Sequence, residues 1–311
     1  MTVLVEVSHL SRYYGSHCAV DDVSFTLKQG EVLGLLGPNG AGKTTTMQML
    51  CGNLAPSTGQ IRINGVDLLD RPKAAKRHLG YLPDTPPLYR DLTINEFLTY
   101  CAELHGVEKQ MIPAAVKRAR ERCGLDEMQE RLIGNLSKGF QQRTGIAQAI
   151  LHNPKVIILD EPTVGLDPLQ IREIRALIRE LGLEHGIILS THILTEVEES
   201  CTHVQIIHQG RMILHETIAG LQRQMHSFTL EVITRTPADL KALSALPGVL
   251  SIEPLAGNRL LVHHGVHDNP AKQLAELIVA SGWGLEEMVP VKKSLEDVFI
   301  QLTRETEAHS G

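Results

Sequence analysis

The sequence Gly37-Pro38-Asn39-Gly40-Ala41-Gly42-Lys43-Thr44 fits the pattern G-x-x-x-x-G-K-[ST] of a phosphate-binding loop. Its glycines let the backbone curl with N–H groups facing the phosphates, Lys43 supplies a positive charge, and Thr44 offers a hydroxyl to Mg²⁺. Residues 31–36 before it read as a buried strand, and apolar residues recur at helical spacing over 47–54. This order of strand, loop and helix predicts a phosphate site at a helix N-terminus.

A second element follows at Val156-Ile157-Ile158-Leu159-Asp160-Glu161, where an apolar run ends in two carboxylates. The run predicts a central parallel strand, and open α/β sheets bind ligands at the carboxyl ends of such strands. Asp160 is therefore a candidate for the Mg²⁺ shell, and Glu161 for activating a water against the γ-phosphate. A strand that merely ends in an acidic turn is the alternative.

Three further positions each allow two interpretations when taken alone. Tyr14 could stack on a base or sit in a surface turn, and Ser137 could mark an anion site or simply cap the following helix. His192, at the end of another predicted buried strand over 186–192, could sense a γ-phosphate or be structural.

Composition narrows the functional classes. The 311 residues suffice for more than one domain, and 30 Lys plus Arg against 36 Asp plus Glu give a net charge of −6, which argues against nucleic acid as the main partner. The five cysteines are scattered without a C-x-x-C pair, as expected of reduced thiols in a cytosolic protein. No signal peptide is expected, and no run approaches the ~18 apolar residues of a membrane helix. Any membrane-spanning part would come from another chain.

The remaining elements that precede the C-terminal part are predicted from local patterns. Residues 1–30 read as a β-rich lead-in, Pro56–Gly59 as a turn and 61–65 as a strand with a hairpin turn. Helical patterns over 93–105 and 113–123 predict a helical subdomain inserted into an α/β core.

The C-terminal part is predicted to be a compact α+β unit of order βαββαβ. Strands are expected over 228–233, 249–252, 259–262 and 285–289, and helices over 237–246 and 270–281. Ser294 and Asp297 predict the capping box of a last helix, and the polar tail 305–311 is expected to be disordered. The spacing of His263, His264 and His267 fits a loop better than a metal site.

Taken together, these motifs identify a family resemblance. Residues 1 to about 215 resemble the ATP-binding cassette of ABC transporters, with every motif in order. The resemblance implies an α/β P-loop NTPase fold with a RecA-like core, an antiparallel β lead-in and an inserted helical subdomain. We expect this cassette over 1–215 and a small ferredoxin-like α+β domain over 226–304.

The resemblance also implies roles for individual residues, with ATP and Mg²⁺ as ligands. The catalytic pair is Glu161 and His192, and Asp167 matches the D-loop. The nucleotide-binding set is Tyr14, Gly37, Pro38, Asn39, Gly40, Ala41, Gly42, Lys43, Thr44 and Thr45. The metal set is Thr44, Asp84 and Asp160. The signature segment, which acts on the ATP of a second copy, is Ser137, Lys138, Gly139, Phe140 and Gln141.

Three of these positions depart from the usual family pattern. Lys138 and Phe140 replace a glycine and a glutamine of the signature, and Asp84 replaces the Q-loop glutamine. An acidic oxygen at 84 can still reach Mg²⁺ or its water, but an amide donor is lost.

The residues of these motifs resemble those of the ATPase subunits of bacterial ABC-2-type exporters. This implies a separate membrane permease, a second nucleotide-binding subunit forming a homodimer, no nucleic-acid partner, and a position on the cytoplasmic face of the inner membrane. The alternatives are a soluble non-transport ABC ATPase and a regulatory module that is gated by nucleotide.

Overall fold

The computed structural model describes residues 2–224, 226–265, 269–292, 297 and 299. The chain divides into two compact units, Met1–Ile218 and Ala219–Gly311, which are described separately.

A six-stranded sheet forms the centre of the first unit, in the order β10-β9-β3-β8-β7-β6. Its strands are β3 (Val32–Leu36), β6 (Leu79–Leu82), β7 (Val156–Asp160), β8 (Gly186–Thr191), β9 (His203–His208) and β10 (Arg211–Thr217). All neighbours are parallel except β9 and β10. Every residue of β3, β7 and β8 is buried, because both faces of the sheet are covered. The predicted central strand is confirmed.

An antiparallel sheet of order β2-β1-β4-β5 forms the lead-in. Its strands are β1 (Val3–Tyr14), β2 (His17–Lys28), β4 (Thr58–Ile63) and β5 (Val66–Asp67). The pairing of β1 with β2 is irregular near His9 (φ 50°) and Asp22 (φ 52°), which interrupts the two-residue period of side chains along both strands. Thr58 and Gly59 belong to β4 rather than to the predicted turn, since Thr58 pairs with Ser11 of β1.

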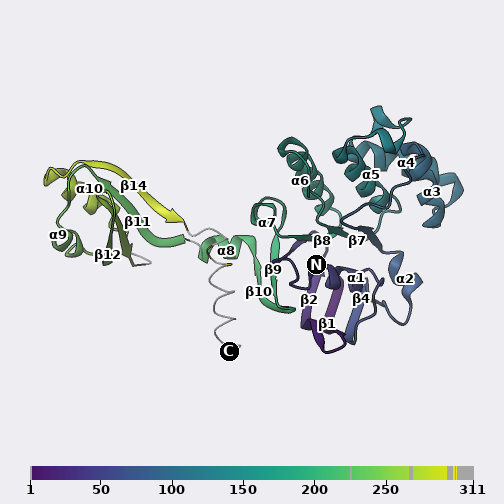
Figure 1. Ribbon diagram of the computed structural model, residues 1–311, viewed down its shortest axis with the longest axis horizontal. Helices are drawn as coiled ribbons and strands as arrows, with labels where there is room; N and C mark the ends of the chain where they lie inside the picture. The colour runs from purple at the N-terminus through teal and green to yellow at the C-terminus, as the bar shows by residue number, and fades with distance from the viewer. Residues whose placement is uncertain (1, 225, 266–268, 293–296, 298, 300–311) are drawn as a thin grey trace. The chain divides into compact units, whose positions relative to one another are not determined.

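The helical subdomain is confirmed. Figure 1 shows α3 (Ile94–Leu104), α4 (Ile112–Cys123) and α5 (Lys138–Ile150) grouped together. A capping box of Thr93 and Glu96 starts α3, and Gly124 in the left-handed region ends α4. The remaining helices of this unit are α1 (Lys43–Leu50), α2 (Pro72–Lys76), α6 (Pro168–Gly182) and α7 (Leu194–Ser200), while α8 (Ile218–Gln224) begins at its last residue.

The second unit has the predicted βαββαβ order. Its elements are β11 (His226–Thr234), α9 (Leu240–Ser244), β12 (Val249–Leu255), β13 (Arg259–His264), α10 (Ala271–Ala280) and β14 (Leu285–Lys292). The antiparallel sheet runs β12-β13-β11-β14 and buries Val232 and Val262 against Leu243, Leu274 and Ile278 of the helices. This is the expected ferredoxin-like arrangement.

Some expectations concern residues outside the described ranges. They include Ser294, with which the last predicted helix opens, His267, and the tail 305–311. Within the part of the chain that the structure describes, no helix is long and apolar enough to cross a membrane.

Candidate functional site

The phosphate-binding loop leaves the end of β3 and leads directly into α1. Gly42, the residue before α1, has φ 105°, and a Cβ there would lie 2.6 Å from the carbonyl oxygen of Ala19. A Cβ on Gly37 would lie 2.3 Å from the carbonyl oxygen of Ile207. Only glycine fits either position without a shift of backbone, so the spacing of the motif follows from close backbone contacts with β2 and β9.

Lys43 is almost completely buried at the start of α1. Its Nζ donates to the carbonyl oxygens of Gly37 (2.8 Å) and Pro38 (3.2 Å) and lies 3.9 Å from Oε1 of Glu161. Burial lowers the pKa of Lys43, and the nearby Glu161 carboxylate opposes this shift. A cation held in this way can balance the negative charge of a bound phosphate.

Asp160 ends β7 and is held by a residue of the neighbouring strand. The hydroxyl of Ser190 on β8 donates to Oδ1 of Asp160. Burial raises the pKa of Asp160, and this hydrogen bond opposes the shift. Sequence reasoning missed Ser190, whose only signal was a hydroxyl two residues before His192 at a strand end.

Glu161 follows directly and has a strained backbone, with φ 47°. Its N–H donates to the backbone oxygen of Ser190 at 3.2 Å, which fixes the turn after β7. Nδ1 of His192, just beyond β8, lies 3.0 Å from both carboxylate oxygens of Glu161. The two predicted catalytic residues are thus brought into contact.

These groups open into one cleft of about 560 Å³. Eleven of the predicted residues line it, namely Tyr14, Asn39, Gly40, Gly42, Lys43, Thr44, Thr45, Asp84, Asp160, Glu161 and His192. Its other lining residues are His17, Ala19 and Val164, which were not predicted. His17 pairs with Tyr14 across the β1–β2 turn, so the Gly15 turn was the signal that could have found it.

Three predicted residues of the loop take other positions. Gly37 and Pro38 contribute the carbonyl oxygens that hold Lys43, and Ala41 is buried in the core between the two sheets. Tyr14 is 47% exposed at the end of β1, with the guanidinium of Arg12 4.8 Å from its ring centroid. Its ring is therefore accessible to a flat ligand in the cleft.

The cleft can accommodate Mg²⁺ on the chemistry of its donors. Thr44, Asp84 and Asp160 all line it, and hydroxyl and carboxylate oxygens are the ligands that Mg²⁺ prefers. Burial of Asp160 leaves a carboxylate whose charge a cation would stabilise.

The signature segment lies at the start of α5, outside the ATP cleft. Residues 137–141 do not line the cleft of their own chain. Ser137 caps α5 by accepting from the N–H of Phe140 (3.5 Å), and Gln141 Nε2 donates to the backbone oxygen of Leu136 (3.0 Å). Ser137 and Lys138 are exposed, so they are accessible to another molecule. Asp167 caps α6 through the N–H groups of Leu169 and Gln170.

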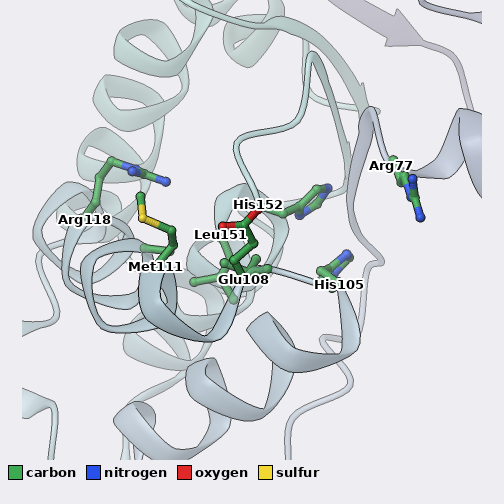
Figure 2. Close-up of a pocket in the computed structure, with 10 residues that line it drawn as sticks. Arg77, His105, Glu108, Met111, Arg118, Leu151 and His152 are labelled. Carbon is green, nitrogen blue, oxygen red and sulfur yellow. The ribbon is translucent and has the colours of Figure 1, made fainter.

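A second cavity of about 460 Å³ is drawn in Figure 2. It is lined by residues that include Arg77, Arg118, His105 and His152. The imidazoles of His105 and His152 stack with centroids 4.0 Å apart and an interplanar angle of 7°. None of the predicted site residues lines this cavity.

Comparison with known proteins agrees with this geometry. The ABC transporter family model matches residues 20–164. The bacitracin transport ATP-binding protein BcrA of Bacillus licheniformis is 34% identical over 319 residues, covering 97% of this chain and 98% of that protein. The ABC transporter ATP-binding protein NatA of Bacillus subtilis is 38% identical over 217 residues, covering 69% and 88%.

Solved structures share the cassette. An ATP-binding subunit of an ABC transporter is 36% identical with a TM-score of 0.65, covering 71% of this chain and 92% of that one. The cbiO1 subunit from Clostridium perfringens, part of the cbiONQ complex, is 28% identical with a TM-score of 0.64, covering 73% and 95%.

Proposed function

Because this chain belongs to the ATP-binding proteins of ABC transporters, we propose that it is the ATPase subunit of an ABC-2-type exporter whose permease is a separate chain. Two copies would close around two ATP molecules, and hydrolysis would let them reopen. The observation that carries this proposal is a half-built site: the cleft holds the phosphate loop, Asp160, Glu161 and His192, but not the signature segment.

Each ATP would bind between two copies. Tyr14 would stack on the base, and the phosphate loop with Lys43 would hold the phosphates. Ser137 and Gly139 of the second copy would cover the γ-phosphate. To switch the dimer almost completely from open to closed, ATP must favour the closed state by ~10⁴-fold.

Glu161 and His192 would carry the chemical step. The Glu161 carboxylate accepts a proton from the attacking water, whose oxygen forms a bond to the γ-phosphorus while the bond to ADP breaks. His192, with Nδ1 3.0 Å from that carboxylate, holds it in place. Mg²⁺ held by Thr44, Asp160 and Asp84 would supply positive charge to the phosphates when bound.

The exporter assignment rests on the relatives. BcrA, by its name a bacitracin transport protein, matches almost the whole chain, C-terminal unit included. Because the alignment covers both units, it argues against the alternative that the chain is a soluble ABC ATPase without a transport role.

We place the permease contact in a groove of about 970 Å³ beside the helical subdomain. Its lining includes Pro83, Tyr89, Phe97 and Tyr100, and the ring of Tyr89 makes edge contacts with Phe97 (6.1 Å) and Tyr100 (5.7 Å). Pro83 lines the groove and Asp84 lines the ATP cleft, so adjacent residues connect the two sites. The permease would hold the chain on the cytoplasmic face of the inner membrane.

Dimer closure can be tested by light scattering after size-exclusion chromatography with ATP and Mg²⁺. Glu161→Gln should run as a dimer, because it should bind ATP but hydrolyse it only slowly. Adding Ser137→Arg to it should return the monomer, since this side chain would fill the space for the γ-phosphate of the second copy. Glu161→Gln protein that stays monomeric at saturating ATP would contradict the shared site.

A further inference from the structure

One buried carboxylate near the site has no role in the chemistry described so far. Glu196 lies in α7 with 1% of its surface exposed, and it does not line the ATP cleft. Burying a carboxylate is costly unless hydrogen bonds replace its lost water. Its hydrogen-bond partners therefore indicate what the burial achieves.

Two threonine hydroxyls satisfy this carboxylate. The hydroxyl of Thr163 donates to Oε1 of Glu196, and that of Thr191 donates to Oε2. Both threonines are themselves buried. The hydroxyl of Thr191 also accepts from the N–H of Ile193 at 3.0 Å. Hydrogen bonds to an ionised acceptor are among the stronger ones in proteins.

The two threonines belong to the two segments that carry the catalytic pair. Thr163 lies two residues after Glu161, in the turn that leaves β7. Thr191 ends β8 and directly precedes His192. One carboxylate therefore ties together two segments that are more than 25 residues apart in sequence, close to the place where Glu161 and His192 meet.

The segments around Glu161 and His192 need to be held together because their local geometry does not fix the two side chains in contact. Glu161 holds a left-handed backbone conformation, φ 47°, which is unfavourable in a residue other than glycine. His192 is exposed and lies between β8 and α7, so little packing restrains its ring. The contact of 3.0 Å between them depends on both segments staying in register.

We propose that Glu196 is a positioning residue for ATP hydrolysis. It clamps Thr163 to Thr191 and so keeps the Glu161 carboxylate against the His192 imidazole. Burial raises the pKa of Glu196 while the bond from Thr191 opposes the shift, as expected of a carboxylate held by donors. The inference rests on the catalytic roles proposed for Glu161 and His192.

The clamp can be opened at either threonine or at Glu196 itself. Thr163→Val and Thr191→Val keep the shape of the side chain and delete one hydroxyl each. Glu196→Ala removes the carboxylate that accepts from both hydroxyls. Each should lower kcat by on the order of 10-fold or more, because small misplacement of a catalytic group is costly. KM for ATP should change little, since the cleft lining is intact. Glu196→Gln, whose amide can still hydrogen-bond to both hydroxyls, should retain most of the wild-type kcat.

A matched control lies on the same helix. Glu199 is exposed and pairs with Arg175 at 2.8 Å rather than with Thr163 or Thr191, so Glu199→Gln makes the same chemical change without removing either bond of the clamp. It should leave kcat unchanged.

The decisive readout is a double-mutant cycle with Glu161→Gln. If Glu196 acts through Glu161, adding Thr163→Val should cause no further loss of kcat in that background. The same loss in both backgrounds, unchanged kcat in the two valine variants, or losses that only track the folded fraction seen by circular dichroism would overturn the proposal. Full turnover by Glu161→Gln alone would instead overturn the proposed function.

Discussion

The stacked imidazoles of His105 and His152 should make the stability of the cassette depend on pH. Figure 2 shows both side chains at the second cavity. Nε2 of His152 lies 3.1 Å from the backbone oxygen of Leu79, and its Nδ1 is buried without a hydrogen-bond partner. Burial, together with the neighbouring His105, lowers the pKa of His152 to about 4. Protonation is therefore opposed in the folded state.

The size of the effect follows from this shift. The pKa of His152 lies below the ordinary histidine value of about 6.5. At about 1.4 kcal/mol per pKa unit, this difference contributes roughly 3 kcal/mol to the free energy of unfolding. The unfolded chain binds the proton more readily, so the contribution is complete above pH 6.5 and is lost as the pH falls towards 4. Between pH 7 and pH 5 the loss should be about 2 kcal/mol.

Urea unfolding followed by circular dichroism at pH 7 and pH 5 measures this loss. His152→Gln keeps an N–H that can reach Leu79 but cannot titrate, so its free energy of unfolding should fall by about 2 kcal/mol less than that of the wild type. An equal fall in both proteins would refute the assigned cause.

Three further predictions concern the ATP cleft. Glu161→Gln should slow turnover by ~10²–10⁴-fold while isothermal calorimetry still detects ATP binding, and unchanged turnover would exclude a general base at this position. Tyr14→Ala should weaken ATP binding by about 1–3 kcal/mol if the ring stacks on the base, and equal calorimetric affinities would show that it does not. Gly37→Ala should abolish ATP binding and lower the free energy of unfolding by about 1–3 kcal/mol, because the added Cβ meets the Ile207 carbonyl. Normal ATP affinity in this variant would contradict the described loop packing.

The positions of the motifs could be predicted because their determinants are local. Gly42 and Lys43 occupy a strand–loop–helix junction whose chemistry depends on adjacent residues, and Asp160 and Glu161 follow an apolar run that is typical of a buried strand. The βαββαβ unit followed from patterns that stay within each element. These parts of the fold needed no knowledge of distant contacts.

The missed features depend on contacts between distant parts of the chain. Ser190 contacts Asp160, and Glu196 contacts both Thr163 and Thr191, only because β7 and β8 are neighbours in the sheet. The seven-residue helix α7 is too short for a clear period, so the chain around Glu196 carried no signal. Strand pairing with β1 likewise extends β4 through Gly59 despite its φ of 95°.

The most direct test of the account is co-purification from native membranes solubilised in detergent, with Glu161→Gln as bait in ATP and Mg²⁺. We expect mass spectrometry to identify one polytopic membrane protein in stoichiometric amount, and Tyr89→Ala with Tyr100→Ala in the groove to reduce its recovery. If the bait brings down only itself, ribosomes or DNA-associated proteins, the chain is not the ATPase subunit of an exporter.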